Sequence, residues 1–204
     1  ELDFAKNKKK MNTRKAHEFD ESGLRVINNN SLNDYLLIRA HGPISKSLTT
    51  HCHNDQLSFE LWLDKKAIIV DNGTGCYSSS LFSRNKFRST KMHNTVIIND
   101  KEINALENSN YFSFFPNSFS EIVSDNLNSH KNNVSCVRYD ENYQNNGIAH
   151  YRDFKYFQNS KFVIKDRIIS KGNFIASSYL HFHPSIDWKL SFESNKKFIS
   201  NIGI

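Results

Sequence analysis

Short apolar runs separated by clusters of Asn, Asp, Gly and Ser recur along this chain, and they constrain its fold more than any other feature. The clearest run covers residues 57–63, LSFELWL, in which the odd positions are apolar and Ser58 and Glu60 are polar. A period of two is typical of a strand that buries one face. Residues 64–66, DKK, separate this run from the apolar run at 67–70, which indicates a hairpin.

Further runs of the same kind predict a fold built from antiparallel strands. They lie at residues 35–39, 95–98, 134–139, 151–157, 162–169 and 175–182. No long helical pattern is evident, and aromatic residues make up 13% of the chain, which favours sheet. We therefore predict an all-β protein, an antiparallel β-sandwich. The Lys- and Asn-rich residues 1–18 are expected to be a linker or the remnant of a preceding domain. Residues 19–204 are expected to form one domain, and truncation at its C-terminus stays open.

Charge and cysteine content leave several partner classes open. The formal net charge is +6, and part of the excess lies at residues 6–10, KNKKK, which we interpret as a solvated tail. A basic chain can bind nucleic acid, a membrane surface or an acidic polysaccharide, and net charge alone does not separate these. No apolar run approaches the roughly 20 residues that span a bilayer. The three cysteines are odd in number and not closely paired, so neither disulfides nor a thiolate zinc cluster is indicated.

The segment most suggestive of chemistry is HCHNDQLSFELW, residues 51–62. In an extended chain, His51, His53 and Asp55 would face the same way. Two imidazoles on one face can both be metal ligands. Alternatively, one is a metal ligand and lies beside a general acid or base. They can equally be structural residues that form hydrogen bonds at a polar edge of the sandwich. Asp55 is either a partner that orients a histidine or a turn residue.

Two more segments place a potential ligand at a strand end. Asp71 lies in IIVDNGTGCY, residues 68–77, after an apolar run and before a Gly-rich turn. His93 lies in RSTKMHNTVIIND, residues 88–100, just before another apolar run. Taken alone, Asp71 is more simply a turn-forming residue and His93 a loop cap.

Together, these three segments resemble the C-terminal domain of heparinase II/III-like proteins. FDESGLRVI at 19–27, DYLLIRA at 34–40 and FVIKDRI at 162–168 extend the resemblance from about residue 19 to about residue 192. The resemblance implies a β-sandwich that follows an N-terminal (α/α) toroid in lyases of acidic polysaccharides. It implies that His53, Asp71 and His93 bind zinc. It places His51 at the cleft between the two domains, as the candidate for catalysis.

β-Elimination on a uronate requires neutralisation of its carboxylate, removal of the C5 proton and protonation of the leaving O4. Arg88, or less favourably Arg84, could bind that carboxylate bidentately, although either could be a surface arginine. The expected partners are therefore an acidic polysaccharide and the toroid domain, with no nucleic acid and no membrane. The resemblance favours a periplasmic or secreted location. Because the family's catalytic Tyr comes from the toroid, we expect this chain alone to be a poor lyase.

Two other functions compete with the lyase. One is a non-catalytic carbohydrate-binding or structural module that retains the zinc site. The other is a cupin-like metalloenzyme, which is disfavoured because Glu60 lies too far from His53 and on the opposite strand face. Among the remaining candidates, His181 and His183 are interpreted as a structural strand end. Trp62 is expected in the core, and Tyr77 is a possible platform for sugar stacking.

Overall fold

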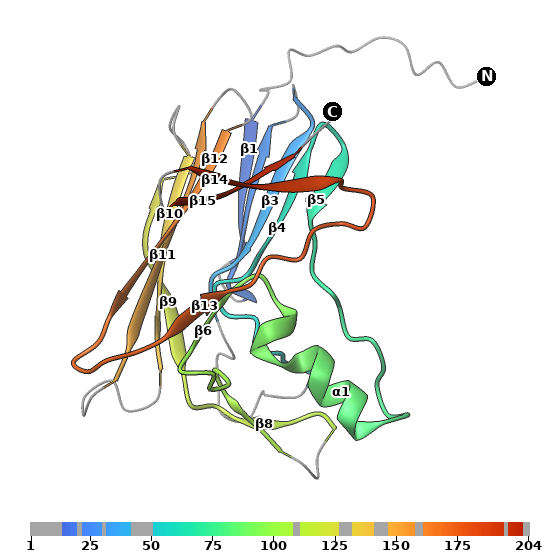
Figure 1. The fold of residues 1–204 in the computed structure, drawn as a ribbon, viewed down its shortest axis with the longest axis vertical. Coiled ribbons are helices and arrows are strands. Elements are labelled where there is room, and N and C mark those ends of the chain that lie inside the picture. Colours follow the sequence, from blue (N-terminus) through green and yellow to red (C-terminus); the bar gives the residue numbers. More distant parts are fainter. Residues whose placement is uncertain are drawn as a thin grey trace.

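The computed structural model describes residues 14–19, 22–29, 32–41, 51–107, 111–126, 132–140, 147–157, 161–193 and 196–201. Two antiparallel sheets form facing layers, and the helix α1 (Leu81–Arg88) lies beyond one end of them (Figure 1). The five-stranded sheet runs β1 (Arg14–Phe19), β2 (Leu24–Asn29), β3 (Asp34–Arg39), β4 (Phe59–Leu63), β5 (Lys66–Ile69). The four-stranded sheet runs β12 (Lys161–Ile169), β11 (Ala149–Phe157), β10 (Asn132–Tyr139), β9 (Phe119–Asn126).

Shorter pairs of strands complete the described structure. They are β13 (Ala176–Ser178) with β6 (Val96–Ile98), β7 (Ala105–Leu106) with β8 (Phe114–Phe115), and β14 (Trp188–Glu193) with β15 (Lys196–Asn201). A 3₁₀ turn, η2 (Thr90–Met92), lies between α1 and β6. Within the described ranges, no helix is long and apolar enough to cross a membrane.

The core lies between the two large sheets, which confirms the predicted β-sandwich. One cluster of buried side chains combines residues of both layers, among them Leu36 and Phe59 from one sheet and Cys136 and Phe154 from the other. The rings of Phe59 and Phe154 meet edge to face, 5.8 Å apart. Apolar burial of this kind stabilises the fold by about 25 cal/mol per Å².

The run at residues 57–63 and its hairpin are confirmed with small differences. β4 begins at Phe59, and Asp64 and Lys65 have φ values of 45° and 63°, as in the two-residue turns that match the twist of a hairpin. Phe59 and Leu61 are buried on the inner face. Trp62 is 38% exposed on the outer face, so its predicted place in the core is wrong.

Three elements depart from the sequence analysis. β1 starts at Arg14 and pairs with β2 in register from Arg14 to Phe19, so residues 14–18 form an edge strand where a linker was expected. Helix α1 was not anticipated; the Ser80 hydroxyl caps it by accepting from the Ser83 amide. β13 is shorter than the predicted run at 175–182.

The second His-x-His segment has a structural place beside β5. Its Phe182 forms a β-bridge with Ile69, and the His183 amide donates to the Ile68 carbonyl at 3.0 Å. The His181 amide donates to the Asn94 side chain at 2.7 Å. This supports the interpretation of His181 and His183 as a strand end.

A group of polar side chains, of which His150 and Arg152 are buried, ties the four-stranded sheet to the loops that carry the candidate site. Asp166 accepts from Arg152 at 2.7 and 3.0 Å and from His150 at 2.7 Å. Arg152 also donates to the carbonyls of Leu57 and Asn94 at 2.8 and 2.7 Å. Arg152 therefore fixes two loop positions from inside the sandwich.

The titration of this group predicts a loss of stability in mild acid. Burial lowers the pKa of His150 to about 4, against the opposing hydrogen bond to Asp166. The folded pKa is below the unfolded value of about 6.5, so the unfolded chain takes up the proton first and stability falls as the pH drops from about 6.5 to about 4. His150→Gln should remove on the order of 3 kcal/mol of this pH dependence, measured by urea unfolding at several pH values. Parallel pH profiles for the two chains would contradict it.

Candidate functional site

Residues 51–58 form an irregular loop that leads into β4. His51 and Leu57 have φ values of 65° and 60°, so the expectation that His51, His53 and Asp55 share one face of an extended chain is wrong. The Asn54 amide donates to the Arg88 carbonyl at 2.9 Å, which fastens the middle of the loop to the end of α1. Left-handed backbone in such residues costs energy and is often found at functional sites.

The structure brings His53, Asp71 and His93 together from three separate segments. Asp71 follows β5, and its Oδ2 lies 2.6 Å from His93 Nδ1. Its Oδ1 accepts from the Gly73 amide at 2.8 Å. The ring of His53 lies 5.2 Å from the ring of His93, centroid to centroid. The three residues therefore surround one small region at the ends of β5 and η2.

The two histidines of this group differ in their preferred charge. Burial, together with the charges of His93 and Arg84, lowers the pKa of His53 to about 3, so this imidazole is neutral. Burial also disfavours the charged form of His93, but the hydrogen bond with Asp71 and the charge of Asp55 outweigh it and raise the pKa. Burial opposes ionisation of Asp71 too, yet its bond with His93 holds the pKa below the usual value.

The donor types of this group suit zinc, which commonly takes imidazole nitrogen and carboxylate oxygen. His93 Nε2 is buried and has no hydrogen-bond partner among the described residues, as expected of an atom that awaits a ligand. In the described residues, however, no three His, Cys, Asp or Glu side chains stand in an arrangement that could hold a metal. Asp71 is bonded to His93, and an Arg84 N–H points to His53 Nε2 at 3.2 Å. The chemistry fits, and the zinc site stays a prediction.

Arg88 does not lie where the sequence analysis expected it. Its side chain is 0% exposed, and it donates to the carbonyls of Cys52, Tyr111 and Ser113 at 3.1, 3.0 and 3.0 Å. A guanidinium that is closed off from solvent and committed to backbone carbonyls is not placed to bind a substrate carboxylate. The structure thus corrects this prediction: Arg88 joins the loop of the first His-x-His to residues 111–113.

Arg84, the less favoured arginine, lies closer to the predicted ligands. It is 1% exposed, donates to Thr74 Oγ1 and to the Tyr111 carbonyl, and its guanidinium lies 5.3 Å from the ring centre of Tyr77. Its bond to His53 requires that imidazole to be the acceptor. Arg84 therefore orients His53 and supports Tyr77, and it does not face solvent.

His51 lies at the exposed edge of this region. Its ring is 5.0 Å from the ring of Phe112 and 5.9 Å from that of Tyr77, and its amide donates to the Phe112 carbonyl at 3.1 Å. Tyr77 is 55% exposed. Phe112 was not singled out by the sequence, because it belongs to no motif and is recognisable only as one aromatic among many.

A small cavity of about 190 Å³ adjoins the other side of the group. Asp55, Glu60 and Asp71 line it together with Arg39. Asp55 lies 3.7 Å from Arg39, in a weak ion pair. Burial raises the pKa of Asp55 and of Glu60, and the charge of Asp71 adds to both. The Asp55 backbone carbonyl accepts from the Ser58 amide, as in a turn. The charge of the Asp55 side chain also raises the pKa of His93, so Asp55 is both a turn residue and an electrostatic partner of a histidine.

Comparison with known proteins identifies the family. The sequence model of the family described as Heparinase II/III-like, C-terminal, matches residues 11–201. The chain belongs to this family. A heparin-sulfate lyase of Bacteroides stercoris is 29% identical to it over 135 residues, which cover 65% of this chain and 18% of that protein. The chain therefore spans about a fifth of the length of this relative.

Solved structures show that the fold of this heparinase II/III-like domain is shared. A heparinase III gene product superimposes with a TM-score of 0.66 and 21% identity, over 87% of this chain and 25% of that chain. A heparan sulfate lyase from Pedobacter heparinus gives a TM-score of 0.58 and 17% identity, over 77% of this chain and 22% of that chain. The β-sandwich is thus one part of considerably longer proteins.

Proposed function

We propose that this chain is the β-sandwich part of a polysaccharide lyase that cleaves a uronate-containing polysaccharide by β-elimination. Membership of the heparinase II/III-like family supports the reaction class. The observation that carries the proposal is the exposed pair His51 and Tyr77, which Arg84 connects to the group of His53, Asp71 and His93.

In this proposal the chain's own residues handle the proton and orient the sugar. The imidazole of His51 can act as a general base or a general acid, which the removal of the C5 proton or the protonation of O4 requires. The exposed face of Tyr77 offers a surface against which a sugar ring can stack, and Arg84 lies behind it. Arg88 and Phe112 hold the backbone of the His51 loop in place. The rest of the machinery belongs to the preceding toroid domain.

Zinc, when bound by His53, Asp71 and His93, would supply a fixed positive charge that locks three segments beside His51. Its protein ligands come from the loop before β4, the end of β5 and the end of η2. The imidazole of His53 is neutral in the folded chain, as metal binding requires. The role proposed for the metal is structural.

The function is tested by expressing the longer natural protein and following the absorbance of unsaturated uronate on a panel of acidic polysaccharides. Cleavage of at least one uronate polymer by the longer protein supports the lyase. Binding of such polymers without any unsaturated product would instead support the alternative, a non-catalytic carbohydrate-binding module. Absence of both would overturn the proposal.

The metal site is tested by elemental analysis of the purified chain. We expect about one zinc per chain, and a trace only in His53→Ala and His93→Ala, with a lower melting temperature. His183→Ala is the matched control, because this histidine also belongs to a His-x-His segment but is bonded to Ser185 at 2.7 Å. Equal zinc in all four chains, or none in freshly purified wild type, would refute the site.

A further inference from the structure

A second cavity in the described part of the chain lies apart from His51 and the predicted zinc ligands. Its volume is about 460 Å³, within the range of about 300–1,000 Å³ typical of ligand sites. It lies between the turn that follows β6 and the segment next to the end of β10. Its lining residues include three isoleucines and three polar side chains, namely Ile98, Ile103, Ile148, Lys101, Glu102 and Asn117. None of its lining residues belongs to the candidate site described above.

Three polar groups of this cavity have unused hydrogen-bonding capacity among the described residues. Glu102 uses Oε2 to accept from Asn54 and from Thr90, at 2.7–2.8 Å, and leaves Oε1 without a partner. Asn117 uses Oδ1 to accept from the Ala105 amide, and its Nδ2 donors are unused. The ammonium group of Lys101 has no partner within the described ranges. The cavity thus offers one charged acceptor, one neutral donor and one cation.

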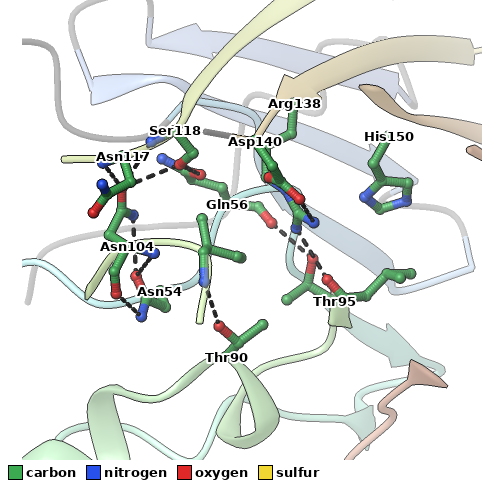
Figure 2. A network of polar contacts seen from close by, with 12 residues as sticks. Asn54, Gln56, Thr90, Thr95, Asn104, Asn117, Ser118, Arg138, Asp140 and His150 are labelled. Atoms are coloured by element: carbon green, nitrogen blue, oxygen red, sulfur yellow. Dashed lines mark hydrogen bonds and ion pairs between the residues drawn. The ribbon is translucent and has the colours of Figure 1, made fainter. Parts of the chain in front are cut away.

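A network of amides holds these groups in place. Figure 2 shows Asn104 between Asn54 and Asn117. Asn104 donates to Asn54 Oδ1 at 3.0 Å, and its own Oδ1 accepts from the Asn117 amide at 2.9 Å. Asn54 and Asn104 are both 0% exposed. The polar wall is therefore preorganised, which lowers the entropic cost of binding a ligand.

The charge of the cavity is nearly balanced. Asp140 lines it too, but Arg138 donates to both of its carboxylate oxygens, at 2.7 and 3.2 Å, as Figure 2 also shows. The remaining charges are those of Lys101 and Glu102. A ligand that carries hydroxyl groups, one negative charge and an apolar ring face matches this wall, since hydroxyls can bond to Glu102 and Asn117 while the isoleucines contact C–H groups.

We propose that this cavity binds one acidic sugar unit of the polysaccharide, remote from the cleavage site, with Lys101 on its carboxylate or sulfate. The ligand class rests on the proposed function, and the site itself rests on the geometry of the cavity. Glu102 accepts a hydrogen bond from Asn54 at 2.8 Å, and Asn54 directly follows His53, so this bond links the cavity to the loop that carries the candidate site. The cavity would hold the chain of sugars beyond the unit that is cleaved.

The test is an NMR titration of the ¹⁵N-labelled chain with a heparan sulfate tetrasaccharide, and with cellotetraose as the uncharged comparison. We expect saturable shifts of the amides of residues 98–103 and 117 with the acidic sugar. Lys101→Ala should weaken this binding about tenfold, as expected for a lost charged hydrogen bond. Glu102→Gln keeps an oxygen that accepts from Asn54 and Thr90, but it replaces the free acceptor by an NH₂ donor. Asn117→Asp keeps the oxygen that accepts from Ala105, but it replaces the free donor by an acceptor. Both variants should weaken the binding of the acidic sugar without unfolding the chain.

Lys66→Ala is the matched control, because Lys66 is an exposed lysine on β5 that does not line the cavity. It removes the same charge and should leave the affinity unchanged. An equal loss of affinity in Lys66→Ala and Lys101→Ala would overturn the inference and leave the lyase proposal standing. Amide shifts confined to residues 51–53 and 77 would have the same meaning. If the amides of the cavity residues shift with the acidic sugar but the longer form of the chain cleaves no uronate polymer, the binding site stands and the lyase proposal is overturned.

Discussion

Replacing Arg88 by Met is expected to lower the free energy of unfolding by about 3–5 kcal/mol. The guanidinium is fully buried at the end of α1 and satisfies carbonyls of Cys52, Tyr111 and Ser113. Methionine fills much of the same volume but donates no hydrogen bond, so these carbonyls would be left buried without their partner. Urea unfolding of the two chains at neutral pH measures the difference.

Two further variants separate this structural role from a role in substrate binding. Lys86→Met lies on the exposed side of the same helix and should change the stability by less than about 0.5 kcal/mol. Arg88→Lys keeps the charge but cannot reach the same set of carbonyls, so it should recover only part of the loss. An Arg88→Met chain that is as stable as the wild type, yet binds acidic polysaccharide more weakly, would restore the original prediction.

The sandwich could be predicted because its strands follow the simplest rule. In β3 and β4, alternate residues are buried, and the chemistry of each position matches the face on which it lies. The turn at Asp64 and Lys65 was equally readable, since short polar connections between two such runs form hairpins. Trp62 is the exception to this match, because its apolar side chain lies on the exposed face of β4.

Helix α1 escaped prediction for a physical reason. The side chains that it buries are Arg84 and Arg88, so its sequence shows no apolar stripe with the helical period. These arginines are stabilised by distant carbonyls and by the ring of Tyr77, and such partners are not visible in a local pattern. The same fact explains why Arg88 was mistaken for a substrate-binding residue.

The candidate site was anticipated through the resemblance more than through geometry. The amino-acid sequences of three segments singled out His53, Asp71 and His93. The structure brings these residues together although they are up to 40 positions apart. The left-handed backbone at His51 and Leu57 could not be foreseen, because nothing in HCHNDQL requires it. That loop is what turns His51 toward Tyr77 and the exposed edge.

If the proposed lyase is active, His51→Ala introduced in it should lower kcat/KM on a uronate polymer by about 10²–10⁴. This is the range expected when a residue that transfers a proton is removed. His51 is exposed, and its ring lies beside those of Tyr77 and Phe112 at the surface, so the variant should stay folded. Stopped assays of unsaturated uronate measure kcat/KM. Melting curves and zinc content on the same samples show whether the variant is folded and still binds the metal.

The pH profile decides between a proton-transfer role and a positioning role for His51. A residue that only shapes the cleft would change KM and leave the pH dependence of kcat as it is, whereas a base or acid sets one limb of the profile. We expect one limb of the profile to disappear in His51→Gln, which keeps a polar side chain of similar reach but cannot serve as a general acid or base. If this variant retains the wild-type limb and loses only affinity, the proton must be handled by another group, and His51 becomes a residue that positions the sugar.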